Sequence, residues 1–418
     1  RSGGTEMRMK DPSMPDGVDA ALVSTAKDSR RVPLPLRSRL AAAAGRMALT
    51  ASQRLHLGRG SMVGGRVALQ LAPEILADLG VGRRLVLVSG TNGKSTTTRM
   101  VVAALEGDEH VIGGIGANAL PGLVSTLIAA PREAVAVLET RESELAAAVL
   151  ALRPHVVVLL NLVNEHADRG AEADDLEADL REVMAAGGES TIIANCDDVR
   201  VVSIACDAPR VIWVSAGRGP QGLLPWCPRC NAQIVVEEPA WWCVSCGLKR
   251  PHPQWRVSEV DTLHGPDGFC EELSLALPGR ANAGNASQAV AAAVAALGVD
   301  PGVALGRVRS VADMEGRYST FAVGGRQVRL LLAKNPVAAR DALTVVAADA
   351  AAVVLILNAE GDDTRDIAWI WELDCAPLGD SAGLVVASGD RATPVSVRLL
   401  YDRVAHVVLP TISDAITV

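Results

Sequence analysis

The residues with the clearest chemistry lie in a short glycine-rich turn. Residues 86–96 read VLVSGTNGKST, so an apolar, strand-like run leads directly into a turn and then a helix-like run. Backbone N–H groups of such a turn favour phosphate oxygens, Lys94 adds a positive charge that can act in catalysis, and the Ser95 hydroxyl can ligate Mg²⁺. The turn thus predicts a site for the triphosphate of ATP. Its residues are Gly90, Thr91, Asn92, Gly93, Lys94, Ser95 and Thr96.

Four cysteines form a second chemical pattern. Cys227 and Cys230 make one CxxC pair, Cys243 and Cys246 make another, and twelve residues separate the pairs. This spacing is typical of a tetrahedral zinc site with four thiolates, and disulfides are the alternative. Four thiolates leave no open coordination position on the metal. We therefore expect structural Zn²⁺ that folds this segment and takes no part in catalysis.

The elements that must position these residues alternate between strand-like and helix-like patterns, which predicts a mostly parallel α/β sheet covered by helices. In such a sheet the phosphate turn lies at the carboxyl edge. A leading helix is expected at 36–57, with a glycine-rich turn at 58–65. Expected strands are 84–89, 134–138, 156–160, 191–194, 210–214, 327–332, 352–357 and 383–387. Other expected helices are 95–105, 143–152, 171–186 and 285–297.

Composition sets the expected domains and excludes several protein classes. Residues 1–37 are expected to be a disordered extension, 38–312 an ATP-binding central domain with a zinc-ribbon insertion at 223–256, and 313–418 a C-terminal α/β domain. A net charge of −8 argues against a nucleic-acid partner. Because no apolar run is long enough to span a bilayer and the start lacks a signal peptide, the sequence predicts a cytoplasmic protein without a transmembrane segment. A peripheral contact with the inner face of the membrane stays open.

Residues 90–96 resemble the phosphate loop of the Mur ligase and folylpolyglutamate synthase superfamily. Two further features agree: residues 161–169 read NLVNEHADR, and Glu139 ends a strand-like run. The resemblance implies a P-loop-type Mur ligase central domain and a C-terminal Rossmann-like domain. It also implies Mg²⁺ held by Ser95 and Glu139 beside the phosphates, and a second Mg²⁺ that His166, in the catalytic site, helps to hold. Residues expected near the nucleotide are Asn195, Asp197, Asp198, Asn282 and Asn285, which could equally be turn and helix-cap residues.

The cysteine insertion narrows the resemblance to the MurT family. Gly316-Arg317, Lys334-Asn335-Pro336, residues 358–374 and residues 388–392 are similar to that family's C-terminal segments. The resemblance implies the synthetase subunit of lipid II isoglutaminyl synthase, paired as a heterodimer with a GatD-like glutaminase. Such a subunit uses ATP to activate the α-carboxylate of D-isoglutamate in lipid II as an acyl phosphate, which ammonia from the partner converts to an amide. Asp366 is then expected to complete the partner's catalytic Cys-His arrangement.

Three alternatives stay open. The turn lacks the first Gly of a full Walker A sequence, so it could be a plain strand-to-helix connection with a chance Gly-Lys-Ser. An amino-acid-adding ligase of the Mur or folylpolyglutamate type is the second, although no lysine lies between Ser95 and Leu248 to supply the central lysine of those enzymes. The third is a catalytically degenerate scaffold for a glutaminase, suggested by Thr140 and Arg141 in the acidic region after Glu139.

Overall fold

The computed structural model describes most of the chain. The described residues are 33–55, 62–107, 109–163, 170–186, 188–216, 225–314, 318–358, 367–409 and 411–417. The chain divides into two units, 1–33 and 34–418, and the account below concerns the second unit. Among its described helices, none is both long and apolar enough to cross a membrane.

The second unit begins with three helices, α2 (Leu36–Arg54), α3 (Val63–Leu71) and α4 (Ile75–Gly80). The expectation of a glycine-rich turn through residue 65 is wrong at its end, because Gly64 and Gly65 lie inside α3. A Cβ atom on Gly65 would lie 1.8 Å from the carbonyl oxygen of Pro121, and one on Gly64 would lie 2.7 Å from that of Gly45. These glycines therefore serve close helix packing rather than a turn.

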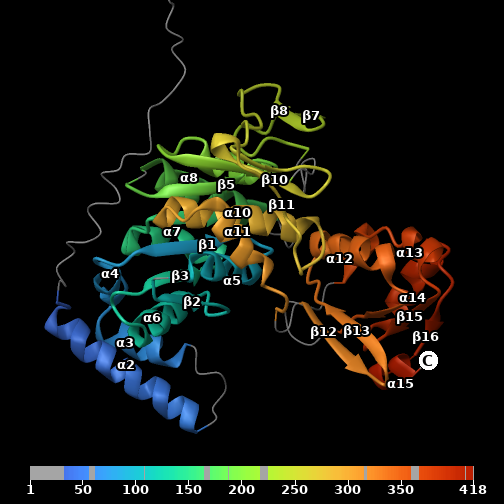
Figure 1. Ribbon diagram of the computed structural model, residues 1–418, viewed down its shortest axis with the longest axis horizontal. Helices are drawn as coiled ribbons and strands as arrows, with labels where there is room; N and C mark the ends of the chain where they lie inside the picture. Colours follow the sequence, from blue (N-terminus) through green and yellow to red (C-terminus); the bar gives the residue numbers. More distant parts are fainter. Residues whose placement is uncertain are drawn as a thin grey trace, which may run out of the picture. The chain divides into compact units, whose positions relative to one another are not determined.

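A nine-stranded sheet forms the centre, in the order β11-β10-β9-β6-β5-β4-β1-β3-β2 (Figure 1). Its first seven strands along the chain pair in parallel, whereas β10 and β11 are antiparallel. The mostly parallel α/β sheet is confirmed, although the sequence did not predict β2 or β9 to β11. The strands are β1 (Leu85–Ser89), β2 (Val111–Gly114), β3 (Val135–Glu139), β4 (Val156–Leu159), β5 (Thr191–Asn195), β6 (Val211–Ser215), β9 (Trp255–Val257), β10 (Thr262–His264) and β11 (Cys270–Glu272).

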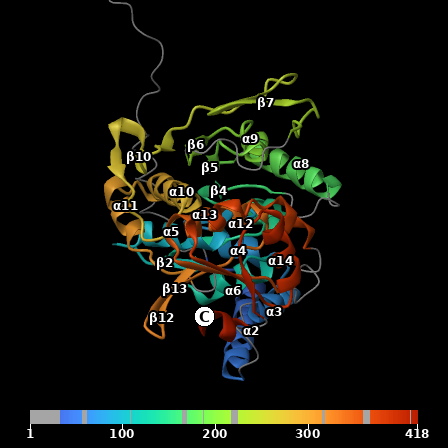
Figure 2. The same cartoon turned by 90° about the vertical axis from the view of Figure 1, so that its right-hand side faces the viewer.

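Helices cover both faces of this sheet. Successive residues of a strand point to opposite faces, so a single strand contributes side chains to two cores. In β1, Val86 and Val88 join one core and Leu85 and Leu87 join the other. The first core is closed by α5 (Lys94–Leu105), α10 (Arg280–Leu297) and α11 (Pro301–Arg309). The second is closed by α2 to α4 with α6 (Leu120–Ala129), α7 (Glu142–Leu152), α8 (Gly170–Ala186) and α9 (Val199–Ala205), the last of which lies beside β5 (Figure 2).

The cysteine segment leaves the sheet after β6 and returns at β9, and these two strands are parallel neighbours. Between them, β7 (Ile234–Glu237) and β8 (Ala240–Cys243) form a separate antiparallel hairpin. We call residues 225–250 the ribbon. Because the sheet pairs the strands on either side of it, the ribbon is inserted without interrupting the order of the core strands.

The C-terminal strands form a second, smaller sheet and a separate hairpin. Strands β14 (Ala352–Ile356), β15 (Leu384–Ser388) and β16 (Val407–Val408) pair in parallel around their own apolar core. Ahead of them, β12 (Tyr318–Val323) and β13 (Arg326–Leu331) form a hairpin whose Gly324 and Gly325 both have positive φ, as a tight two-residue turn requires. The other elements are α12 (Pro336–Asp349), α13 (Ala376–Ser381), α14 (Ala392–Tyr401), α15 (Ile412–Thr417) and the 3₁₀ helices η3 (Pro266–Gly268) and η5 (Ala368–Glu372).

Candidate functional site

The glycine-rich turn joins β1 to α5, as the sequence predicts, and α5 begins at Lys94. Gly90 has φ 146° and Gly93 has φ 84°, values that side-chain-bearing residues rarely adopt. A Cβ atom would also lie 2.8 Å from the Cβ of Leu160 at the first position and 2.7 Å from Oδ1 of Asn285 at the second. Only glycine suits either position, so the turn lies tightly against β4 and α10.

Lys94 is buried in the turn. Its Nζ donates hydrogen bonds to the carbonyl oxygens of Gly90 and, at 3.3 Å, Thr91, and it forms an ion pair with Glu142 at 3.4 Å. Burial lowers the pKa of Lys94, and the nearby carboxylate of Glu142 opposes that shift. The ammonium group therefore lies among the backbone groups at the start of α5, where a helix end also favours anions.

Glu139, at the end of β3, is fully buried and lies beside Ser95. Its carboxylate accepts hydrogen bonds from Ser95 Oγ at 2.7 Å, from the backbone N–H of Gly116 at 2.8 Å and from Asn118 Nδ2 at 3.4 Å. Among the described residues, none forms an ion pair with Glu139. A hydroxyl and a carboxylate brought together in this way fit the oxygen ligands that Mg²⁺ prefers. His166, which is expected to help hold a second Mg²⁺, lies outside the described residues.

Asn161, which the sequence had singled out only as the first residue of the 161–169 motif, holds the turn against β4. Its Oδ1 accepts from the N–H of Asn92 at 2.8 Å, and its Nδ2 donates to the carbonyl of Asn92 at 3.0 Å. The carbonyl of Asn161 accepts from the N–H of Thr91 at 3.0 Å. The available signal was its position directly after a buried strand, because the carboxyl ends of neighbouring parallel strands meet at one edge.

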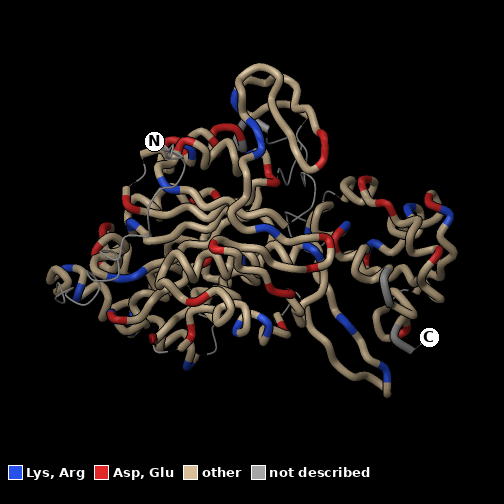
Figure 3. The backbone as a smooth tube through the Cα atoms, turned by 45° about the horizontal axis from the view of Figure 1, so that its top comes forward, with Lys and Arg blue, Asp and Glu red and all other residues tan. Residues whose placement is uncertain are grey.

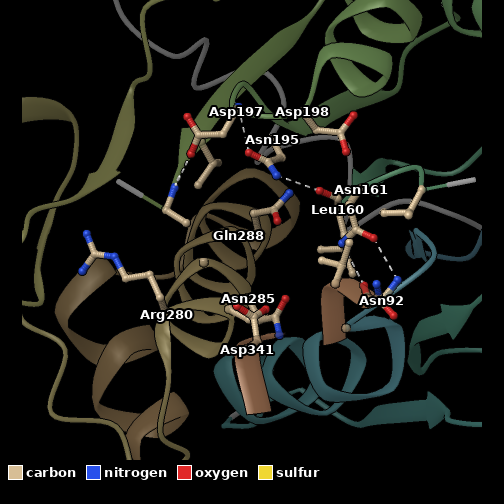
Figure 4. Close-up of a pocket in the computed structure, with 17 residues that line it drawn as sticks. Asn92, Leu160, Asn161, Asn195, Asp197, Asp198, Arg280, Asn285, Gln288 and Asp341 are labelled. Atoms are coloured by element: carbon tan, nitrogen blue, oxygen red, sulfur yellow. Dashed lines mark hydrogen bonds between the residues drawn. The ribbon is translucent and has the colours of Figure 1, made fainter. Parts of the chain in front are cut away.

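Beside the turn lies a pocket at the carboxyl edge of β4, β5 and β6 (Figure 4). Asn285 and Gln288 line it from α10, while the guanidinium of Arg280 turns away to pair with Asp261 at 2.7 Å. Asn282 does not line the pocket; its side chain bonds the carbonyl of Pro278 at 2.7 Å. The full lining is Asn92, Gly93, Leu160, Asn161, Val163, Asn195, Asp197, Asp198, Val214, Ala216, Arg280, Ala281, Gly284, Asn285, Gln288, Val337 and Asp341.

Two expected nucleotide residues line this pocket but also bond the protein itself. Asn195 donates to the carbonyl of Leu160 at 2.9 Å. Asp198 caps α9 by accepting from the N–H of Val201 at 2.9 Å, and it accepts from the N–H of Leu162 at 3.1 Å. Burial raises the pKa of Asp198 to about 6, against the lowering effect of these N–H donors. Both residues therefore shape the pocket wall, and the helix-cap alternative is confirmed for Asp198.

The adjoining Asp197 connects the pocket wall to the ribbon. It pairs with Arg250 at 2.7 Å and accepts hydrogen bonds from Ser215 Oγ and the N–H of Ala216, both at 2.9 Å. Burial raises the pKa of Asp197, and the guanidinium of Arg250 opposes that shift. The indole N–H of Trp241 also donates to the carbonyl of Cys196 at 3.3 Å. The ribbon is thus attached directly to the segment that follows β5.

The C-terminal segment contacts the phosphate turn at Asn335, which the sequence had singled out only as part of a motif. Asn335 caps α12 by accepting from the N–H of Ala338 at 3.0 Å. Its amide also exchanges hydrogen bonds with that of Asn92, at 3.0 and 3.3 Å. Asp366 and the Gly316-Arg317 pair lie outside the described residues.

The four cysteines of the ribbon converge. Their Sγ atoms all lie within 4.8 Å of one another, with Cys227 3.5 Å from Cys246 and Cys230 3.4 Å from Cys243. Four thiolates around zinc at ~2.3 Å would be separated by about 3.8 Å. The N–H groups of Ser245 and Cys246 point at the Cys243 sulfur. This donor set fits a zinc ion, and no pair of these cysteines is joined by a disulfide.

Comparisons with known proteins agree with this geometry. Residues 88–220 match the Mur ligase middle domain and residues 332–417 match the MurT ligase C-terminal domain. The subunit MurT of lipid II isoglutaminyl synthase (glutamine-hydrolyzing) from Streptococcus pneumoniae is 28% identical over 82% of this chain and 83% of its own. The subunit of the same name from Staphylococcus aureus is 24% identical over 85% of both chains.

Among solved structures, a pseudomurein peptide ligase type C from Methanothermus fervidus has the same fold. Its TM-score is 0.61 at 20% identity, and the match covers 82% of this chain and 70% of that one. The chain thus carries a segment that matches the Mur ligase middle domain, followed by one that matches the C-terminal domain of MurT ligases.

Proposed function

We propose that this chain is the synthetase subunit of a glutamine-dependent, ATP-driven amidoligase that amidates the α-carboxylate of D-isoglutamate in lipid II. The names of the two MurT relatives, which match over more than four-fifths of the chain, support this function. The observation that carries it is the contact of Ser95 with Glu139 next to Lys94, because that arrangement suits phosphoryl transfer. A plain strand-to-helix turn would need none of these groups.

The chemistry takes two steps. A carboxylate oxygen of the substrate attacks the γ-phosphorus of ATP, the bond to the β–γ bridging oxygen breaks, and ADP leaves. Ammonia then attacks the carbonyl carbon of the acyl phosphate, phosphate leaves with the electrons of its C–O bond, and the nitrogen loses a proton. Lys94 and the N–H groups of the turn would bind and orient the phosphates in both steps.

Two metals fit the residues present. Ser95 and Glu139 would hold Mg²⁺, which neutralises charge on the transferred phosphoryl group, and His166 would help to hold a second Mg²⁺. The four ribbon cysteines would hold structural Zn²⁺. We further propose that residues 313–418 form a Rossmann-like domain and that Asp366 completes the catalytic triad of a GatD-like glutaminase partner.

The decisive experiment supplies the chain with ATP, ammonium and a muropeptide that contains D-isoglutamate. We expect ADP release together with an amide product detected by mass spectrometry, and loss of both in Lys94→Met. An amino acid joined to the product would instead identify an amino-acid-adding ligase. Failure to hydrolyse ATP with substrate and glutaminase present would favour a degenerate scaffold, which Thr140 and Arg141 in the acidic region first suggested.

A second experiment isolates the role of Asp366. In the heterodimer, Asp366→Asn should abolish amidation driven by glutamine while leaving amidation driven by free ammonium unchanged. Asp363→Asn, a few residues earlier, is the matched control and should retain both activities. Equal loss of both activities in Asp366→Asn would remove this residue from the partner's triad and place its role within the synthetase itself.

A further inference from the structure

The charge of the chain is distributed unevenly at its start. Residues 33–73 contain six arginines and no Asp, Glu or Lys, although the whole chain has a net charge of −8. The first acid after this stretch is Glu74, which pairs with Arg37 at 3.7 Å. Figure 3 shows Asp and Glu spread along most of the rest of the described chain. A basic segment in an acidic protein indicates an anionic partner.

Helix α2 carries four of these arginines, and its exposed side is also apolar. Its buried residues are small or polar, so α2 packs closely on α3 through Gly45. Leu36, Leu40 and Met47 are instead 70%, 64% and 68% exposed. At about 100° per residue, these three side chains fall within about 40° of one another around the helix. They form a single apolar stripe along the outside of the helix.

The arginines flank that stripe. By the same helical geometry, Arg37 lies on one side of it, Arg39 and Arg46 lie on the other, and Arg54 ends the helix. We call the stripe together with these four arginines the outer face of α2. Long basic side chains beside exposed leucines are typical of helices that lie in a bilayer interface, where the apolar groups enter the lipid and the guanidinium groups contact headgroups.

Other occupants fit this face less well. A nucleic-acid backbone would use the arginines but leaves the leucine stripe unexplained. A second copy of the chain would bring four arginines against four arginines, and such like charges repel. We propose that the outer face of α2 is a peripheral docking surface for an anionic lipid bilayer. The argument depends on the charges and apolar side chains of α2 and needs no assumption about the reaction.

Docking would have a functional consequence if the substrate is lipid-linked. Binding to the same surface confines enzyme and substrate to one interface, which raises their effective concentration without any new contact in the active site. Loss of the outer face would then raise KM for a lipid-linked substrate and leave kcat unchanged. A soluble muropeptide would show no such change, so this readout separates failure of docking from failure of the proposed activity.

The test is co-sedimentation of the full chain with vesicles of phosphatidylcholine alone or with one-third phosphatidylglycerol. We expect binding to the anionic vesicles only, weakened by salt. Arg39→Gln with Arg54→Gln should reduce the affinity about thirtyfold, at ~1 kcal/mol for each arginine. Leu40→Ser with Met47→Ser should reduce it at least tenfold. The matched controls are Leu150→Ser, at a leucine that is 63% exposed on α7, and Arg210→Gln with Arg326→Gln.

Three outcomes would overturn the proposal. The first is absence of wild-type binding to anionic vesicles, which would also result if another part of the chain covers α2. The second is equal binding by wild type and the stripe variant, because the apolar residues would then have no role. The third is tighter binding to duplex DNA than to vesicles, retained by the stripe variant, which would assign the face to nucleic acid. Circular dichroism of every variant excludes unfolding as the cause.

Discussion

Two buried carboxylates at the same edge of the central sheet have opposite surroundings. Glu139 ends β3 and, among the described residues, accepts hydrogen bonds from the neutral donors Ser95, Gly116 and Asn118. Asp197 follows β5 and pairs with the guanidinium of Arg250 at 2.7 Å. Both are almost fully buried, so both are removed from the water that would stabilise their charge.

The difference shows how to tell a structural acid from one that can bind a cation. A buried, charged carboxylate must be stabilised by a positive partner or by several hydrogen-bond donors. The protein supplies a positive partner for Asp197 from the ribbon. For Glu139, no described side chain forms an ion pair, and the nearest hydroxyl is the Ser95 group that magnesium would share. Position at a strand end is common to both acids, so the partner, not the position, separates their roles.

The largest effect is expected on ATP turnover when Glu139 is replaced. Glu139→Gln keeps the shape and a hydrogen bond from Ser95 but removes the charge that would hold Mg²⁺. We expect ATP turnover to fall roughly a thousandfold, because charge stabilisation by a bound metal contributes several kcal/mol to the transition state. Steady-state ADP release at saturating Mg²⁺ measures this.

The exposed Glu106 of the α5 C-terminus provides the control, and Glu106→Gln should turn over like wild type. The free energy of unfolding should hold or rise in Glu139→Gln, because a buried charge has been neutralised. A variant that is strongly destabilised yet retains turnover would place Glu139 in the same class as Asp197 and break the comparison.

Asp197 should show the reverse pattern. Removing it in Asp197→Ala leaves the guanidinium of Arg250 without its carboxylate, and breaking such a buried pair typically costs about 3 to 4 kcal/mol. Urea unfolding followed by circular dichroism measures this loss. In a double-mutant cycle with Arg250→Met, the second substitution should cost much less once Asp197 is gone. Additive losses would show that the two side chains do not stabilise each other.

Much of the fold was predictable because the strands carry a strong local signal. The runs that became β1, β3, β4, β5 and β6 are short, apolar and rich in Val and Ile, and all five were expected within a residue or two. Strands β9 to β11 were missed because each has only three residues, too few for a period to show. The predicted turn was wrong at Gly64 and Gly65 because glycine occurs both in turns and at close helix contacts, and the sequence alone does not separate the two.

The candidate site likewise has parts that the sequence predicts and parts that it does not. The phosphate turn and the four cysteines were predictable, because their chemistry depends on spacing along the chain. The pairing of Asp197 with Arg250 was not predictable, since the two residues lie 53 positions apart in the sequence and neither belongs to a motif. Asn161 and Asn335 were likewise missed as site residues, because their contacts with Asn92 exist only once the strands and helices have assembled.

A smaller effect is expected from Asp198, whose pKa is raised to about 6 by burial. A raised folded-state pKa means that the folded protein binds more protons than the unfolded one between pH 4 and 6. The free energy of unfolding should therefore fall by up to about 3 kcal/mol as the pH rises through this window, and stay level above it. Asp198→Asn preserves the helix cap and should remove that fall. Urea unfolding at a series of pH values measures it, and an unchanged slope in the variant would contradict the assignment.

The smallest effect tests whether the ribbon supports the nucleotide pocket. Arg250 pairs with Asp197, which lines the pocket, so loss of the zinc proposed for the ribbon should loosen that wall without changing the phosphate turn. We expect Cys230→Ser to weaken binding of a fluorescent ATP analogue by about tenfold or less, which corresponds to ~1.4 kcal/mol. Cys206→Ser, at an exposed cysteine outside the cluster, is the matched control. If Cys230→Ser lost its metal yet bound the analogue normally, the ribbon would be independent of the pocket. Asp197 would then stabilise the fold and have no part in nucleotide binding.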